Sequence, residues 1–443
     1  STLDYTSDGT LDALTRSNGV TTSFGYDGAV RLDAVSHTGP AGVIDSFDYT
    51  MDAAGNRIGV TTAAGSETYT LDELGRLTQV VYPDGQVVAY TYDAAGNRLS
   101  ETVDGATTSY TYDAAGRLAS DGVQTYSYDA AGNTTAIGSD TYTWDWANRL
   151  VAATVAGESV AYDYDGAGLR VGSTDSSGLT ESVWDRASLL PMLVSDGTSG
   201  YVHLGRQPHE TITGAAATFD LTDALGSVRA TTDTTGAVTA TASYDVFGGV
   251  RAATGTLGTF GFTGEQEDPT GLLYLRARHY NPAVGRFLSA DALQPNSFGT
   301  QGWSQYGYVA GNPTTMVDPT GYAALVEYSL KAAVTTAAVS AGFGFVISVF
   351  TCQGTQADGT FMGSYSGCVF RGTLAAGIGG FLGGGFVGAP LWFMYGSAFA
   401  GGFIESGIFQ GLAGDFSLGQ ALFDGLIATA AFGAARIAVS YTH

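Results

Sequence analysis

The stretch Tyr90-Thr-Tyr-Asp-Ala-Ala-Gly-Asn-Arg-Leu99 decides the fold, and it returns almost unchanged as Tyr110-Thr-Tyr-Asp-Ala-Ala-Gly-Arg-Leu118. Alternation in Tyr-x-Tyr places both rings on one face of a strand. The aspartate then opens a turn in which glycine supplies a positive φ angle, and Arg-Leu begins the returning strand. Each copy therefore predicts one β-hairpin, which cannot bury its aromatic face alone.

Copies of this unit run through residues 1–170. Their aspartates stand 16 to 21 residues apart, at Asp52, Asp72, Asp93, Asp113, Asp129, Asp145 and Asp165. Stacked hairpins can bury their aromatic faces together, which predicts a mainly β fold built as a long, curling sheet. A single carboxylate per unit favours a turn cap over a calcium ligand. Packing in the core is likewise favoured over sugar binding for the stacked tyrosines.

Composition excludes several classes of protein. With 44% hydrophobic and 14% charged residues, the chain is not disordered. The net charge of -24 and the lack of a basic stripe argue against nucleic acid as a partner of the main body. Cys352 and Cys368 fit a disulfide or two buried thiols equally well, no spacing resembles a zinc site, and no cofactor is expected. No signal peptide is visible, so the N-terminus is interpreted as an artificial boundary or a cleaved end.

Residues 219–322 carry a denser series of motifs. They include Gly271-Leu-Leu-Tyr-Leu-Arg-Ala-Arg-His-Tyr-Asn-Pro282, Gly285-Arg-Phe-Leu-Ser-Ala-Asp291 and Val317-Asp-Pro-Thr-Gly-Tyr322. With the repeats, this series resembles the YD-repeat (RHS) family of bacterial Rhs proteins, Tc-complex C proteins and teneurins, over about residues 1–322. In that family the strip winds into a hollow shell, which in toxin members encloses a C-terminal effector. The resemblance implies a repeat shell at 1–218, an RHS-repeat-associated core at 219–322 and an effector or membrane-active region at 323–443.

Two carboxylates in the core, Asp291 and Asp318, suggest chemistry. If the fold brings them together they cannot both ionise cheaply, so one stays protonated while the other activates a water, as in aspartic proteases. The resemblance implies the same, because toxin members cut their own chain with two aspartates and an arginine, here Asp291, Asp318 and Arg278. The implied cut lies between Tyr322 and Ala323. The stretch Ala-Leu-Gln-Pro-Asn after Asp291 and the tyrosine at the cut depart from the family pattern, and both aspartates remain open to interpretation as turn residues. His279, among aromatic residues, is expected to be a packed core histidine.

After Tyr322 the composition changes abruptly. Residues 323–443 contain eight charged side chains and residues 372–404 contain none, which predicts a small helical, Gly/Ala-rich region. Residues 332–350 and 372–404 are long enough to span a bilayer. Gly380, Gly384 and Gly388 form a small-residue ridge suited to close helix packing. Three interpretations remain open: a membrane-active segment, a shell-enclosed linker to a missing toxin, and plain structural packing.

Together these features predict a secreted or cell-surface toxin-delivery shell that encloses a hydrophobic C-terminal peptide and releases it by self-cleavage. Its expected partners are its own C-terminal region as cargo, a target-cell membrane, and either further N-terminal delivery domains or a separate delivery partner. The alternative is a surface adhesion or structural YD-repeat protein with a hydrophobic anchor. A toxin-type chain should yield two fragments, whereas an anchored protein should stay whole.

Overall fold

The computed structural model describes residues 1–7, 9–187, 190–292, 304–322 and 324–326. The chain divides into two compact units, Ser1–Glu327 and Tyr328–His443, and the described residues belong to the first. This unit is mainly β, as predicted. Its described part contains two one-turn 3-10 helices, η1 (Phe262–Gly264) and η2 (Val309–Gly311). The region predicted to be helical lies outside the described residues, apart from 324–326.

The strands β1 to β28 follow one another as an antiparallel meander in four sheets, each strand paired with its neighbour in sequence. The first sheet comprises β1 (Thr2–Tyr5), β2 (Leu11–Thr15), β3 (Thr21–Tyr26), β4 (Leu32–Gly39), β5 (Gly42–Met51), β6 (Arg57–Thr62), β7 (Gly65–Leu71), β8 (Leu77–Val81), β9 (Val87–Tyr92), β10 (Arg98–Val103) and β11 (Ala106–Ser109). The second comprises β12 (Thr111–Tyr112) and β13 (Leu118–Ser120).

The third sheet comprises β14 (Tyr126–Tyr128), β15 (Thr134–Ile137), β16 (Asp140–Trp144), β17 (Leu150–Val155), β18 (Glu158–Tyr164), β19 (Arg170–Asp175) and β20 (Gly178–Glu181). The fourth comprises β21 (Val183–Asp185), β22 (Met192–Ser195), β23 (Ser199–Leu204), β24 (Gln207–Thr213), β25 (Ala216–Thr222), β26 (Val228–Thr232), β27 (Val238–Tyr244) and β28 (Val250–Thr254). Two small sheets follow, one of β29 (Gln266–Glu267), β30 (Leu273–Tyr274), β31 (His279–Asn281) and β32 (Arg286–Phe287), the other of β33 (Met316–Val317) and β34 (Leu325–Val326).

Each repeat turn is held by its own aspartate. The Oδ1 of Asp93 accepts hydrogen bonds from the backbone N–H groups of Ala95 and Asn97, both at 2.8 Å. The Asp93 carbonyl accepts from the N–H of Gly96, whose φ of +90° is one that side chains rarely adopt. The aspartate thus saturates the turn's backbone donors, which confirms the turn-cap interpretation.

Neighbouring hairpins are linked by the second aromatic residue of each repeat. Its hydroxyl donates to a backbone carbonyl of the preceding hairpin at 2.7 Å, as in Tyr92 to Leu77, Tyr112 to Arg98 and Tyr164 to Leu150. The ring itself packs inward, so both ends of the side chain are used. These bonds explain why the unit retains tyrosine, and they confirm that the tyrosines serve packing.

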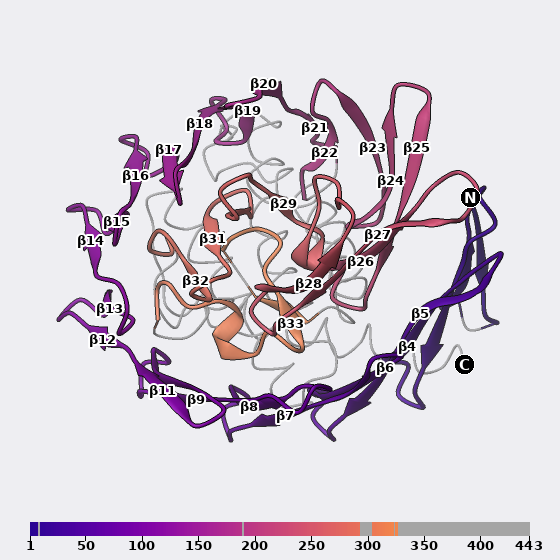
Figure 1. Cartoon of the computed structure of the whole chain (residues 1–443), viewed down its shortest axis with the longest axis horizontal. Coiled ribbons are helices and arrows are strands. Elements are labelled where there is room, and N and C mark those ends of the chain that lie inside the picture. The colour runs from indigo at the N-terminus through magenta and orange to yellow at the C-terminus, as the bar shows by residue number, and fades with distance from the viewer. Residues whose placement is uncertain (8, 188–189, 293–303, 323, 327–443) are drawn as a thin grey trace, which may run out of the picture. The chain divides into compact units, whose positions relative to one another are not determined.

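The described residues of segment 260–322, called the core segment from here on, lie against the tyrosine-bearing face of this strip. Figure 1 shows the strands from β4 to β25 curving around the segment that carries β29, β31, β32 and β33, with β26 to β28 running in towards that segment. Hydrogen bonds join the two layers at widely separated strands: the Tyr280 hydroxyl donates to the Phe247 carbonyl at 2.6 Å, and the Tyr306 hydroxyl to the Gly132 carbonyl at 2.7 Å. The buried residues Leu272 and Leu288 pack into the hydrophobic cluster of the third sheet. The core segment therefore packs against the inner side of the curve at several places.

The beginning of the strip also contacts its fourth sheet. The Arg16 guanidinium donates to the Asp220 carbonyl at 2.9 Å, and the Asn18 amide donates to the Thr232 hydroxyl at 3.0 Å. The first and fourth sheets therefore meet near the turn between β2 and β3. The division between residues 218 and 219 remains a sequence-based one, and β25 runs across it.

Candidate functional site

The structure brings Arg278, Asp291 and Asp318 together. Arg278 immediately precedes β31, Asp291 follows β32, and Asp318 follows β33. The guanidinium Nη2 of Arg278 lies 2.9 Å from Oδ2 of Asp291 and 3.5 Å from Oδ2 of Asp318. The side chains are 3%, 6% and 0% exposed, respectively. Two carboxyl groups thus share one buried positive charge, a grouping that is costly for stability alone.

The arginine is held firmly between the carboxyl groups. Its Cζ lies 3.6 Å from the centre of the Phe287 ring, and its Nη1 donates to the Gln305 carbonyl at 3.2 Å. The same carbonyl accepts from the backbone N–H of Asp291 at 2.9 Å, so Gln305 aligns both partners. Burial lowers the pKa of Arg278, while the charges of the two aspartates oppose that shift.

The segment before the predicted cut is bound carbonyl by carbonyl. Arg276 Nη1 donates to the carbonyl of Pro319 at 2.7 Å, and the backbone N–H of Ala277 donates to that of Thr320 at 3.2 Å. Arg278 Nε donates to the carbonyl of Gly321. Three consecutive residues, 276 to 278, therefore hold three consecutive carbonyls, 319 to 321. This arrangement fixes the position of the chain relative to the two carboxyl groups.

The binding residues sit on a strained turn between β30 and β31. The N–H of Leu275 donates to the carbonyl of Arg278 at 2.9 Å, which closes the turn. Arg276 has a φ of +61°, an uncommon value for a residue with a side chain. Its guanidinium also contacts Oε2 of the buried Glu265 at 2.5 Å. The turn is thus anchored through the arginine side chain, and sequence reasoning missed both Arg276 and Glu265.

Glycine is the residue type that fits at position 321. Its φ is +73°, and a Cβ there would lie 2.5 Å from the Leu275 carbonyl oxygen and 2.9 Å from the Arg278 nitrogen. The close approach of the two backbones therefore requires glycine. Its neighbour Tyr322 is 43% exposed, whereas Ala323 on the other side of the predicted cut lies outside the described residues.

Asp318 also serves as a turn residue. Its Oδ1 accepts hydrogen bonds from the Thr320 hydroxyl at 3.1 Å and from the Thr320 N–H at 3.3 Å, while Oδ2 faces Arg278. The turn interpretation is therefore correct for Oδ1, while Oδ2 is paired with Arg278. His279, as predicted, is packed in the core: its ring lies 5.1 Å from Tyr162 and 5.2 Å from Tyr274 between ring centres. Burial lowers the pKa of His279 well below its usual range, so the ring is neutral.

The remaining residues singled out in the sequence, Gly380, Gly384, Gly388, Cys352 and Cys368, lie outside the described residues. Within the described ranges, no helix is both long and apolar enough to cross a membrane. Across those same ranges, no three His, Cys, Asp or Glu side chains gather as metal ligands would.

Known proteins resemble this chain in sequence. The tRNA nuclease WapA of Bacillus subtilis is 33% identical over 190 residues, which is 40% of this chain and 8% of WapA. The toxin subunit YenC2 of Yersinia entomophaga is 41% identical over 68 residues, 15% of this chain and 6% of that protein. The chain thus spans less than a tenth of the length of these relatives.

Solved structures share the fold. Crystal structures of TcdB2–TccC3 complexes superimpose with a TM-score of 0.60 at 21% identity, over 72% of this chain and 19% of theirs. The Tc holotoxin pore of Photorhabdus luminescens gives a TM-score of 0.60 at 20% identity, over 74% of this chain and 19% of that one. The family model of the teneurin YD-shell matches residues 54–183 and 218–311, just over half of the sequence. The chain therefore belongs to the teneurin YD-shell family of YD-repeat proteins.

Proposed function

We propose that this chain is the shell and self-cleaving core of a secreted, toxin-type YD-repeat protein, and that it cuts itself between Tyr322 and Ala323. One observation carries the proposal: Arg278 contacts Asp291, Asp318 and the carbonyl of Gly321. Gly321 lies one residue upstream of Tyr322, after which the chain is cut. A buried cluster of this kind is expected where catalysis, rather than stability, sets the arrangement.

The chemistry is that of a carboxyl pair. One aspartate, ionised, takes a proton from a water that attacks the carbonyl carbon of Tyr322. The other, protonated, donates a hydrogen bond to the carbonyl oxygen as negative charge develops there. The C–N bond then breaks, the amide nitrogen of Ala323 takes up a proton, and the products are a carboxylate at Tyr322 and an amine at Ala323. Arg278 orients the ionised partner and the substrate segment together.

Positioning accounts for much of the expected rate. The reaction is intramolecular because the carboxyl groups and the bond lie in one chain. The carbonyls of residues 319 to 321 are already bound, so the entropic cost of bringing substrate to catalyst is met when the chain folds. A single turnover suffices, because the chain has one such bond. The site therefore has to position the bond accurately, but it does not have to release its products.

The named relatives support a toxin-associated role for the shell. YenC2 is a toxin subunit and WapA a tRNA nuclease, and TccC3 is joined to TcdB2 in the solved complexes. We infer that residues 323–443 are the cargo of this shell and that a separate delivery component completes the particle. Because residues 372–404 hold no charged side chain, a membrane-active peptide fits this cargo better than an enzyme. The intended partner is then the membrane of a target cell.

Substitution of the aspartates tests the proposal. Asp291→Asn and Asp318→Asn keep the shape of each side chain and remove its titration, so each variant should remain one uncut chain on a denaturing gel. Asp113→Asn is the matched control, because Asp113 caps a repeat turn far along the sequence from the site. The wild type and the control should give two bands. Normal cleavage in either site variant rules out the carboxyl pair, and an uncut wild type favours the anchored surface protein instead.

A further inference from the structure

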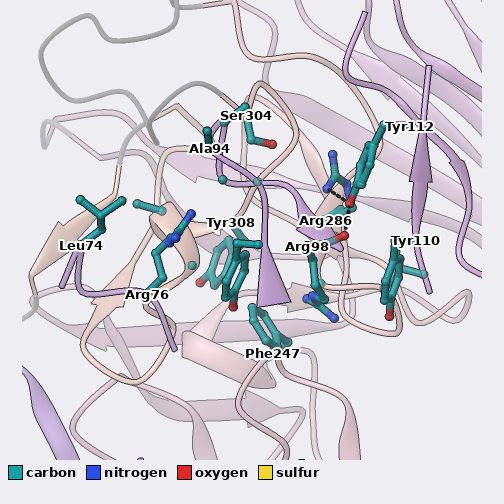
Figure 2. A pocket seen from close by; sticks show the side chains of 18 residues that line it. Leu74, Arg76, Ala94, Arg98, Tyr110, Tyr112, Phe247, Arg286, Ser304 and Tyr308 are labelled. Atoms are coloured by element: carbon teal, nitrogen blue, oxygen red, sulfur yellow. Dashed lines mark hydrogen bonds between the residues drawn. The ribbon is translucent and has the colours of Figure 1, made fainter. Parts of the chain in front are cut away.

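A second feature of the described unit is a cavity of about 360 Å³ between the repeat strip and the core segment. Its walls come from three separate parts of the sequence: the repeat turns near Arg76 and Arg98, the loop at Phe247, and the core residues around Arg286 and Tyr308. The volume lies in the range of sites that hold small molecules. Figure 2 shows Tyr308 and Phe247 in the middle of this group, with the labelled arginines around them.

The charges of the walls are all of one sign. Arg76, Arg98 and Arg286 line the cavity, and none of its described lining residues is a carboxylate. The chain as a whole carries a net charge of -24, with 18 basic against 42 acidic side chains. Three guanidinium groups without an acidic wall residue are therefore unexpected here. Arg76 is paired with Asp72 at 2.7 Å and Arg98 lies 3.8 Å from Glu101, so among the described residues Arg286 is the wall arginine without a carboxylate partner.

Arginine stacked on tyrosine is common in this fold and needs no ligand. Arg117 lies 5.0 Å above the Tyr128 ring and Arg149 5.1 Å above the Tyr164 ring. Each of these arginines is also paired with the aspartate of its own turn, at 2.7 and 2.6 Å. Stacking and pairing together account for an arginine in a repeat turn.

Arg286 lacks the second of these partners. The turn before it begins with Asn281, a neutral amide five residues ahead of Arg286 that caps the turn through Oδ1, whereas Asp113 and Asp145 lie four residues ahead of the arginines they pair with. Arg286 is 7% exposed and donates to the Tyr112 hydroxyl at 3.1 Å. Among the described residues no ion pair joins Arg286 to a carboxylate, and its Nη2 makes no hydrogen bond. A buried guanidinium in this state is costly unless an anion compensates it.

Two further wall residues, Ser304 and Arg98, could also donate hydrogen bonds to a ligand. The Ser304 hydroxyl is buried and has no partner within the described structure. The ion pair of Arg98 with Glu101 is long, at 3.8 Å, and the Arg98 guanidinium stacks on Phe247 at 4.2 Å instead. The cavity thus offers donors for an anion and aromatic faces for an apolar body.

We propose that this cavity binds a small organic anion, with a phosphate or carboxylate group held by Arg286, Arg98 and Arg76 and an aromatic or apolar body packed on the tyrosine and phenylalanine rings. Guanidinium groups recognise both head groups through paired N–H donors. The rings favour flat bodies through stacking. This site is separate from the carboxyl pair, and the proposal does not depend on self-cleavage.

Calorimetric titration of the purified full chain at low ionic strength tests the proposal. The probes are phenyl phosphate, benzoate, inorganic phosphate and phenol. Phenyl phosphate or benzoate should bind at least tenfold more tightly than inorganic phosphate or phenol, because only these two engage both the arginines and the rings. Whichever of the two binds better identifies the head group. Absence of binding by both at millimolar concentration overturns the site.

Matched variants locate the binding. Arg286→Gln and Arg76→Gln should each weaken binding about tenfold or more through a lost charge-assisted hydrogen bond. Arg117→Gln is the control, since Arg117 forms the same turn ion pair at 2.7 Å but does not line the cavity. Ala94→Trp should block the site without removing any polar group, and tryptophan already stands at the same turn position in Trp146, which is 93% exposed. Equal weakening by the control, or unchanged binding in the Arg286 and Ala94 variants, contradicts the proposal.

Discussion

Replacing Arg278 with lysine should slow self-cleavage strongly while the fold stays intact. The guanidinium reaches the two aspartates through Nη2, the Gln305 carbonyl through Nη1 and the Gly321 carbonyl through Nε. A lysine ammonium keeps the positive charge near the carboxyl groups but cannot place donors in three directions of one plane. The bond to Gly321 is therefore lost, and the segment before the cut loosens.

The size of the effect follows from that lost bond. A hydrogen bond from a charged donor contributes about 1.5–3 kcal/mol. If it serves to position the reacting carbonyl, its loss raises the barrier by that amount, which slows cleavage about 10- to 100-fold. Arg278→Ala should be slower still, because it leaves two buried carboxyl groups with no positive partner.

The assay is a pulse of labelled synthesis in a cell-free system, followed by gel analysis of the full chain and its two fragments over time. Thermal unfolding of the uncut variants checks that the strip has folded. Arg117→Lys is the control, since Arg117 pairs with Asp113 in a repeat turn and makes no contact with the site. Cleavage of Arg278→Lys and Arg278→Ala at the wild-type rate would refute the role given to Arg278.

Three other outcomes are expected, the first two from the structure and the third from the sequence. Gly321→Ala should abolish or greatly slow cleavage, since its Cβ would meet the Leu275 carbonyl oxygen at 2.5 Å, and gel analysis would show an uncut but folded chain. Asp268→Ala should lower the free energy of unfolding by about 3–5 kcal/mol, because it leaves the Arg170 guanidinium, 2.8 Å from Asp268 and 4% exposed, unpaired; denaturant titration measures this loss. An isolated peptide of residues 323–443 should make liposomes leak, and Gly384→Arg should reduce dye release because a charge at mid-bilayer costs about 3 kcal/mol or more; a peptide that stays in solution contradicts the membrane-active proposal.

The strip was predictable because its signals are local. Alternating Tyr-x-Tyr and the Asp-x-x-Gly turn fix each hairpin within about ten residues, and the turn bonds of Asp93 match that interpretation. The pattern could not predict the contact between the first and fourth sheets, for example the hydrogen bond from Arg16 to the Asp220 carbonyl. Residues 204 positions apart in sequence meet there, and no spacing rule relates them.

The candidate site divides in the same way. Arg278, Asp291 and Asp318 were found by their motifs, and their meeting depends on the fold. The hold on the segment before the cut was missed, because it rests on a strained turn at Arg276 and on a backbone approach that only Gly321 allows. The close backbone approach could have been suspected from the glycine in Asp-Pro-Thr-Gly, but neither the turn at Arg276 nor the partner 43 residues away could.

The cavity of the further inference left no sequence signal, since its arginines come from repeats and core alike. Arg286 follows a turn that begins with the neutral Asn281, but nothing in the sequence of that turn indicates a cavity.

The central claim is that the folded chain cuts itself once, after Tyr322. Intact-mass measurement of the natively purified 443-residue chain examines that claim most directly. The account predicts two species whose masses match residues 1–322 and 323–443, and which elute together on size exclusion before denaturation. A single species of 45.5 kDa would contradict it.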